Sequence, residues 1–385
     1  MICATGLSTV SDPLAGAAEA AAEVAAGLGG AEADLVVVFA SGAHLAAPEL
    51  ALEELTARLS PGALIGCGAG GVLAGGRELE AGTAIAVWAT ALEHGSAHPF
   101  RAQVTELDEG GLLEGIPELS SDAILIMLSD PFSFPTDGVL DGLARDAPGV
   151  PVLGGLASAR TPEGGTALFE GEELCDTGAV GVCLRGVEMI PCVSQGATPM
   201  GREMTITAAD GNVIQELAGR PAVTAIEQVV AELGVEERAL VASGLLIGIV
   251  IDGGKPEYEQ GDFLVRGVLG ADSQTGAVAI GATVSPGQVV RLHARDARSA
   301  DQDLRRELRL RARAIGGRPP AGALMFSCNG RGRSMFGACD HDATMVHDVL
   351  GGAPAAGFFA AGEIGPVGGR SFLHSFTATV AVFPG

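Results

Sequence analysis

Short apolar stretches alternate with helix-like stretches along most of the chain, and the same order occurs three times. Continuous apolar strands that alternate with helices are typical of a sheet covered on both faces. The pattern therefore predicts an α/β protein of two similar domains built from repeated strand–helix–strand units. The three series are strand 35–39, helix 49–59 and strand 84–89; strand 123–128, helix 138–145 and strand 179–184; and strand 323–327, helix 342–350 and strand 378–383.

After the helix of each series comes a short strand that ends at a Gly-rich turn, and one glycine falls at the same place in all three, at Gly66, Gly154 and Gly357. Glycine accepts positive φ and lets another group approach the backbone closely. Tight turns alone explain some of the 58 glycines but not this recurrence. We therefore interpret these turns as loops around a small-molecule site, with the backbone of Gly66, Cys67 and Gly68 shaping it.

The segment between the second and third series has a different pattern. Asp210-Gly211 is typical of a hairpin turn, and Pro221 begins a helix with one apolar face. Stretches at 245–251, 263–269, 277–280 and 288–297 then alternate as strands with one buried face do. The sequence predicts an antiparallel meander in the C-terminal half and a domain boundary near residue 195. The first domain would hold two repeat units, and residues 196–385 the meander, an Arg-rich helix and the third unit.

Composition narrows the choice of partners. The 385 residues carry a net charge of −24, which disfavours nucleic acid and anionic membranes because both are bound mainly by clustered cations. No apolar run reaches the roughly 18 residues of a membrane span, and no basic leader precedes the first apolar residues. We expect a soluble, cytoplasmic protein. We interpret the cationic cluster from Arg305 to Arg313 as a solvated helix face rather than a docking surface.

The cysteines suggest neither disulfides nor a bound metal. The chain has seven cysteines and no CxxC pair, so neither a disulfide framework nor a zinc ribbon is indicated. Cys339, His341 and His347 are close in the sequence, but their spacing fits neither a zinc finger nor an HExxH site. We expect no metal and no cofactor.

The loop after the strand at 323–327 has the densest set of functional residue types. Loops at the carboxyl ends of strands are where α/β sheets bind ligands, and a guanidinium grips a carboxylate or phosphate through paired hydrogen bonds. The loop therefore predicts a site for an acidic or zwitterionic small molecule. A nucleotide is disfavoured, because Met335 stands where GxGxxG needs its third glycine and Lys255 is not in a Walker A motif. The predicted site residues in this loop are Ser327, Cys328, Asn329, Gly330, Arg331, Gly332 and Arg333.

A second cluster surrounds Gly362 and Glu363. Glu363 could bind a ligand amine, or it could accept hydrogen bonds from backbone N–H groups and hold the loop, since a buried carboxylate needs partners in either case. We expect this stretch to share a cavity with the bend after Phe326. Arg266, in FLVRG, is a further candidate for contact with an anion.

Several motifs together resemble the FIST family, with both its N-terminal and C-terminal domains. They are SCNGRGR, GFFAAGEIGPVGGRSFLHSFTATVAVF, FLVRGVLGAD, AVAIGATVSPGQVVRLHARDA, VFASGAH and LIGCGAGGV. The resemblance covers roughly residues 33–383. It implies a sensory role in signal transduction, with small ligands such as amino acids bound and a signalling protein as a partner.

Two other functions remain open from the residues alone. Cys328 could be the nucleophile of a hydrolase or transferase, with His374 or His341 as base and Glu363 orienting it. Cysteines after buried strands are more often small core residues. A protein-interaction module that binds no small ligand is the other alternative.

Overall fold

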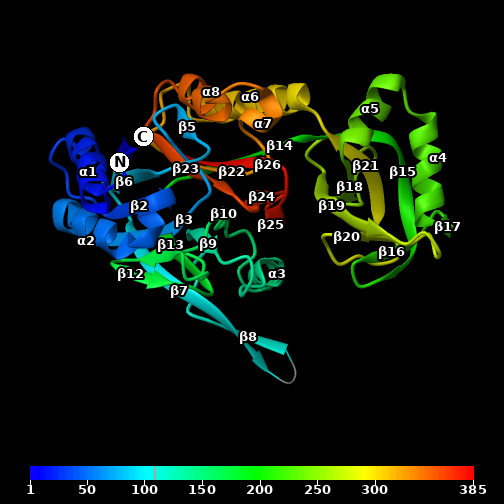
Figure 1. Cartoon of the computed structure of the whole chain (residues 1–385), viewed down its shortest axis with the longest axis horizontal. Coiled ribbons are helices and arrows are strands. Elements are labelled where there is room, and N and C mark those ends of the chain that lie inside the picture. The colour runs from blue at the N-terminus through cyan, green and yellow to red at the C-terminus, as the bar shows by residue number, and fades with distance from the viewer. Residues whose placement is uncertain (108–109) are drawn as a thin grey trace. The chain divides into compact units, whose positions relative to one another are not determined.

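The computed structural model describes residues 1–107 and 110–385, which form two compact units (Figure 1). The first unit comprises Met1–Val193, Arg305–Leu373 and Ala378–Gly385, and the second comprises Ser194–Leu304 and His374–Thr377. The chain leaves the first unit close to the expected boundary at 195 and returns to it at Arg305. All three repeats therefore lie in one unit, and the second unit is an insertion between the second and third repeats.

The predicted repeats are present, and each has the same three-stranded centre. In each, the first strand pairs in parallel with the second and antiparallel with the last, and a helix connects the first two. The first repeat has β2 (Leu35–Ser41), α2 (Pro48–Leu59), β3 (Ala63–Gly68) and β6 (Ala84–Ala91). The second has β9 (Ile124–Ser129), α3 (Thr136–Asp146), β10 (Val152–Leu156) and β13 (Ala179–Arg185), and the third has β22 (Gly322–Cys328), α8 (His341–Val349), β23 (Ala355–Ala360) and β26 (Thr377–Phe383).

Each repeat also contributes a hairpin to the sheet of another repeat, and we call this the lent hairpin. The hairpin follows the second strand, and its first strand pairs antiparallel with the second strand of a different repeat. The exchange is cyclic: the first repeat lends to the third, the third to the second, and the second to the first. The hairpins are β4 (Val72–Ala74) with β5 (Arg77–Leu79), β24 (Glu363–Val367) with β25 (Arg370–His374), and β11 (Leu168–Glu170) with β12 (Glu173–Cys175).

Further strands and helices complete the first unit. Each sheet gains a further strand beside the last strand of its repeat, namely β1, β7 and β14, and β8 pairs with the outer side of β7. Helices α1 and α2 lie together against the first sheet, as Figure 1 shows. The remaining elements are β1 (Ile2–Ser8), α1 (Pro13–Leu28), η1 (Gly42–Ala46), β7 (Ser96–Leu107), β8 (Gly110–Glu114), β14 (Ile190–Gln195), α7 (Arg333–Phe336) and α6 (Ala297–Ala314), of which α6 begins in the second unit.

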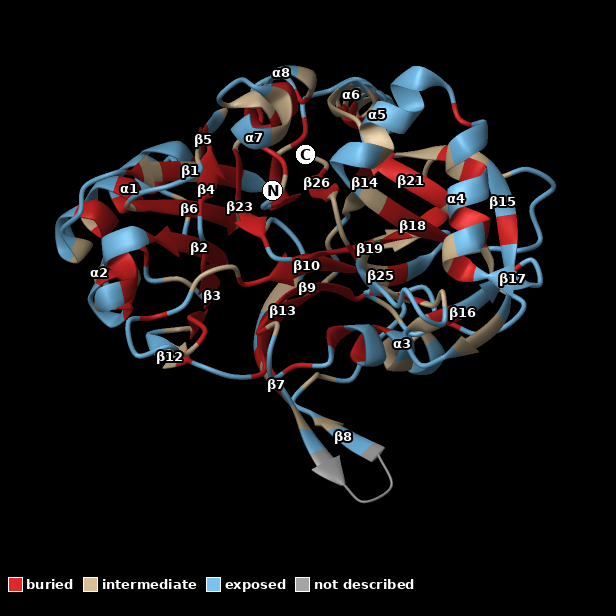
Figure 2. Ribbon diagram, turned by 45° about the vertical axis from the view of Figure 1, so that its right-hand side comes forward, coloured by how far each residue is buried: buried red, intermediate tan, exposed pale blue. Residues whose placement is uncertain are grey.

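The continuous apolar strands are explained by burial on both faces. In β2, Val37 and Phe39 enter a core that the three sheets share, while Val36 and Val38 pack with the helices outside the sheet. The strands at the centre of the sheets are correspondingly buried along most of their length in Figure 2. Successive side chains of each strand alternate between the two faces of the sheet. The sequence does not show this alternation, because both faces require apolar side chains.

The recurring glycines have a steric role within the sheets. Gly66, Gly154 and Gly357 lie within the second strand of each repeat rather than in the turn after it. A Cβ atom at these positions would lie 2.2, 1.8 and 1.7 Å from the carbonyl oxygens of Val38, Met127 and Met325. Close approach of the neighbouring strand, rather than of a ligand, therefore accounts for the recurrence.

The second unit contains the predicted antiparallel strands, but they close into a barrel. Consecutive pairings run β15–β21–β18–β19–β20–β16, and β16 pairs back onto β15. The hairpin predicted at Asp210-Gly211 joins β15 to β16, and Pro221 precedes α4 as expected. Its elements are β15 (Ala197–Asp210), β16 (Val213–Leu217), β17 (Arg220–Pro221), α4 (Ala222–Glu232), α5 (Val235–Ser243), β18 (Leu245–Val250), β19 (Phe263–Ala271), β20 (Val278–Ile280) and β21 (Val289–Arg295).

Within the described residues, no helix combines the length and the apolar character that crossing a membrane requires.

Candidate functional site

The predicted loop begins where β22 ends, in the first unit. Ser327 is buried, and its hydroxyl donates to Oδ2 of Asp342 at 3.2 Å. The backbone N–H of Asn329 donates to the carbonyl of Ala360 at 2.9 Å, which ties the loop to the end of β23. The Cys328 side chain is almost buried, and the N–H of Gly330 lies 3.5 Å from its Sγ. The loop thus starts from a rigid strand end.

Arg331 is buried and forms a two-point ion pair. Its Nε and Nη2 donate to Oδ2 and Oδ1 of Asp342 at 2.6 and 3.0 Å, and both residues are almost inaccessible to solvent. Burial raises the pKa of the Asp342 carboxyl, but the charges and hydrogen bonds of Arg331 and His341 outweigh it and hold that pKa well below its usual range. Two of the three guanidinium nitrogens are therefore committed to the fold. Nη1 is buried and has no hydrogen-bond partner among the described residues.

Glu363 lies close enough to Arg331 to raise the pKa of its guanidinium. It is fully buried at the start of β24, opposite Gly155 of β10. Burial lowers the pKa of the Arg331 guanidinium, but Asp342, Cys328 and Glu363 together raise it above its ordinary value. The structure thus brings the Glu363 stretch and the Arg331 loop together within the first unit.

The hairpin lent by the first repeat fastens both ends of this loop. A Glu80 carboxylate oxygen accepts from the N–H of Arg333 at 2.7 Å, and Gly332, at φ +69°, leaves room for that carboxylate. Glu78 accepts from the N–H of Ala343 at 2.9 Å and donates its own N–H to Asp340 at 2.6 Å. Burial, reinforced by the charge of Asp342, raises the pKa of Glu78 to about 7 despite the hydrogen bond from Ala343.

Sequence reasoning missed Asp342, Glu78 and Glu80. Asp342 could have been found from its position at the start of a helix near a buried arginine. The two glutamates carry no such signal, because they are more than 250 residues away in the sequence and reach the loop only through the pairing of β4 with β23.

The predicted glycines join the repeats to one another. Ser158 donates its N–H to the carbonyl of Gly68 at 3.3 Å, and Leu156 donates to that of Gly362 at 2.8 Å. Cys67 is fully buried, and burial raises the pKa of its thiol well above the ordinary value. These positions form a backbone junction between the three Gly-rich turns.

The other predicted residues differ in burial. Arg333 and Asn329 are exposed, so their side chains reach solvent beside the buried Arg331. Arg266 lies in β19 of the second unit, where it is buried and donates from Nη1 to its neighbour's carbonyl, that of Val265, at 3.3 Å.

His341 stacks on Phe336 with a centroid distance of 3.6 Å, and its Nδ1 lies 2.9 Å from Oδ1 of Asp342. Within the described residues, no group of three or more His, Cys, Asp and Glu side chains is placed to hold a metal ion.

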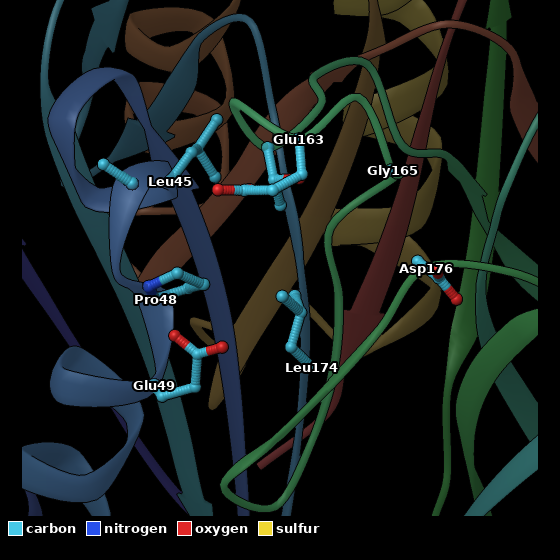
Figure 3. Close-up of a pocket in the computed structure, with 9 residues that line it drawn as sticks. Leu45, Pro48, Glu49, Glu163, Gly165, Leu174 and Asp176 are labelled. Atoms are coloured by element: carbon cyan, nitrogen blue, oxygen red, sulfur yellow. The ribbon is translucent and has the colours of Figure 1, made fainter.

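A cavity that the sequence did not indicate lies elsewhere on the first unit. It has a volume of about 390 Å³ and opens between η1 with the start of α2 and the loop that leads into β11 and β12 (Figure 3). Leu45, Pro48 and Leu174 supply apolar wall, and Glu49, Glu163 and Asp176 supply carboxylates. Its location depends on the lent hairpin, which no local pattern predicts.

Comparison with known families decides where the chain belongs. The FIST N domain model matches residues 34–220, and the FIST C domain model matches residues 222–366. The chain belongs to the FIST family. FIST domains are regarded as sensory, signal-transduction domains. An uncharacterized protein of Mycobacterium tuberculosis is 44% identical to this chain over 380 residues, covering 98% of both, and an uncharacterized Mycobacterium bovis protein is 41% identical over 98% of this chain and 97% of its own length.

Proposed function

We propose that this FIST protein senses a small amino acid or another small carboxylate, bound at the loop from Ser327 to Asp342. The observation that carries the proposal is the third nitrogen of the buried Arg331 guanidinium, which has no hydrogen-bond partner among the described residues. A buried N–H donor without a partner is costly, and a ligand carboxylate would satisfy it with a charge-assisted bond.

The electrostatics around Arg331 suit a ligand that carries both charges. Asp342 already neutralises the guanidinium, and Glu363 adds a further carboxylate nearby. A simple carboxylate would gain less there than a zwitterion, which could place its carboxylate toward Arg331 and its ammonium toward Glu363. The exposed Asn329 and Arg333 lie beside the pair and could contact the rest of the ligand. A signalling protein would then respond to the occupied state.

A thermal-shift screen with the standard amino acids and small carboxylates tests the proposal. A ligand present at a hundred times its Kd stabilises the native state by about 2.7 kcal/mol, so a binder should raise Tm clearly. Arg331→Lys keeps a cation for Asp342 but replaces the three guanidinium nitrogens with one, so the nitrogen offered to the ligand is lost, and Arg333→Ala removes only an exposed side chain. We expect both variants to reduce the ligand-induced shift.

Matched controls are available on the surface. Arg370→Lys changes an arginine that pairs with Asp141 in solvent, and Arg318→Ala removes an exposed arginine elsewhere. Both should keep the full shift. The proposal fails if no compound raises Tm, or if the shift is as large in Arg331→Lys and Arg333→Ala as in the wild type.

One observation favours a second function, cysteine-dependent hydrolysis or group transfer. Asp342, rather than Glu363, orients the His341 ring through Nδ1, as a general base is oriented in nucleophilic catalysis. Cys328 also lies close enough to Arg331 to contribute to the raised pKa of the guanidinium. Stoichiometric alkylation of Cys328 at neutral pH, together with turnover of an ester or amide, would support this function instead of sensing.

A further inference from the structure

The cavity between the first and second repeats occupies a place equivalent to the Arg331 loop. In each sheet of the first unit, a hairpin from another repeat lies beside the second strand, close to the loop that follows the first strand. In the third repeat this arrangement joins β4–β5 to the Arg331 loop, and in the first repeat it joins β11–β12 to η1 and α2. The fold therefore offers a second position for a ligand, with different side chains.

The charged side chains of this cavity are all acidic. Glu49, Glu163 and Asp176 line it, and none of the three forms an ion pair with another described residue. The adjacent Arg160 places its guanidinium over the ring of Phe132, with Cζ 4.0 Å from the centroid. A cation is the ligand that three such carboxylates would attract.

The hydroxyl of a largely buried threonine is also available to a ligand in this cavity. Thr161 lines the cavity and is only 8% exposed. Its backbone is fixed, because its N–H donates to Gly165 and its carbonyl accepts from Gly164, both at 2.9 Å. The hydroxyl itself has no hydrogen-bond partner within residues 1–107 and 110–385. It can therefore accept from an N–H group that enters the cavity.

The lining combines apolar wall with carboxylates. Glycine at 165 lets the loop approach the hairpin, because a Cβ there would lie 2.9 Å from that of Asp176. In the view of Figure 3, Leu174 lies between Glu49 and Asp176. Leu174 thus supplies apolar wall beside the carboxylates, which a chain of methylenes could cover.

We propose that this cavity binds a linear alkyl diamine. One ammonium group would pair with Asp176 and the other with Glu49 and Glu163, where it could also donate to the Thr161 hydroxyl. The methylene chain would pack on Leu174. A monoamine can satisfy only one end of the cavity, so the second ammonium is the feature that the site selects.

Isothermal titration with 1,4-diaminobutane, 1,5-diaminopentane and n-butylamine tests the proposal. We expect the diamines to bind up to about fivefold more tightly than butylamine, as one additional exposed ion pair allows, with the difference narrowing at high salt. Equal affinity for butylamine and the diamines would overturn the proposal, as would an absence of heat from all three.

Matched variants distinguish binding in this cavity from the general attraction of cations to a chain with net charge −24. Asp176→Asn and Glu49→Gln should each weaken diamine binding about two- to fivefold, whereas Glu172→Gln on the same hairpin and Glu53→Gln on the same helix should not. Thr161→Val should weaken binding without lowering the Tm of the free protein. Equal losses in the control variants would show that the cavity is not the site. No residue is shared with the Arg331 loop, so either proposal can fail alone.

Discussion

Glu78 shows how one buried carboxyl can make stability depend on pH. Burial, with the charge of Asp342 adding to it, raises its pKa to about 7, whereas an unfolded chain would protonate it near its ordinary value of 4.5. The native state therefore binds the proton more tightly. The stabilisation of the native state by the protonated Glu78 carboxyl is complete below about pH 4.5 and is lost as pH rises through about 7.

The variant Glu78→Gln should remove this dependence. Glutamine keeps an oxygen for the N–H of Ala343 but carries no charge beside Asp342. Between pH 5.5 and pH 8 we expect the wild type to lose about 2 kcal/mol relative to the variant, at about 1.4 kcal/mol per pKa unit. Urea unfolding at both pH values measures the difference. The exposed Glu53→Gln is the control, and a wild type that parallels Glu78→Gln would contradict the prediction.

The sequence was informative about the site only where chemistry was concentrated in one segment. Arg331 stood out because it follows an apolar strand among glycines, and the structure places it, buried, in the loop after β22. The segment did not reveal that Arg331 is held in an ion pair, in which two of its nitrogens bond to Asp342. Glu78 and Glu80 lie in a three-residue strand and the residue after it, and they reach the loop through a hairpin whose partner strand is distant in the sequence.

At the scale of elements, parallel pairing constrains one position in each repeat. The carbonyl of Met325 would lie 1.7 Å from a Cβ at 357, and that oxygen belongs to a strand backbone that cannot move alone. The same geometry recurs at Gly66 and Gly154 with the corresponding strands. A side chain at any of the three would force two paired strands apart.

Gly357→Ala should therefore destabilise the protein by about 3 kcal/mol or more, the upper range for overpacking a core. Gly138→Ala is the matched control, because an added Cβ meets nothing within 4 Å and the residue lies in α3. It should raise stability by about 0.5–1 kcal/mol by favouring the helix. Chemical denaturation compares the two. A loss below 1 kcal/mol at position 357 would mean that the strands can separate at little cost.

Long elements were predictable and short ones were not. The central strands and the helices α2, α3 and α8 follow from apolar runs and amphipathic spacing, and the structure confirms them within a few residues. The lent hairpins have strands of three to five residues, so a periodicity of two has little length over which to appear. Closure of the predicted meander into a barrel likewise depends on the pairing of β16 with β15, which is set by tertiary contacts.

At the scale of the whole molecule, no repeat of the first unit is complete by itself. The sheet of the third repeat takes its outer strands from elsewhere in the chain: β4 and β5 come from the first repeat, and β14 precedes the barrel. Its own hairpin pairs with β10 of the second repeat. The barrel, in contrast, obtains all its strand partners between Ala197 and Arg295.

This difference predicts how fragments of the chain should behave. A fragment of residues 194–304 should fold, because every barrel strand keeps its partners. A fragment of residues 196–385 should contain a folded barrel attached to an unfolded third repeat, since β23 lacks β4 and the apolar strand β22 cannot be covered on its inner face. Hydrogen exchange and limited proteolysis of both fragments measure this directly. If residues 322–383 are protected in the longer fragment as strongly as in the full chain, the third repeat can fold as part of an independent C-terminal domain. The cyclic exchange of hairpins would then not be what holds the first unit together.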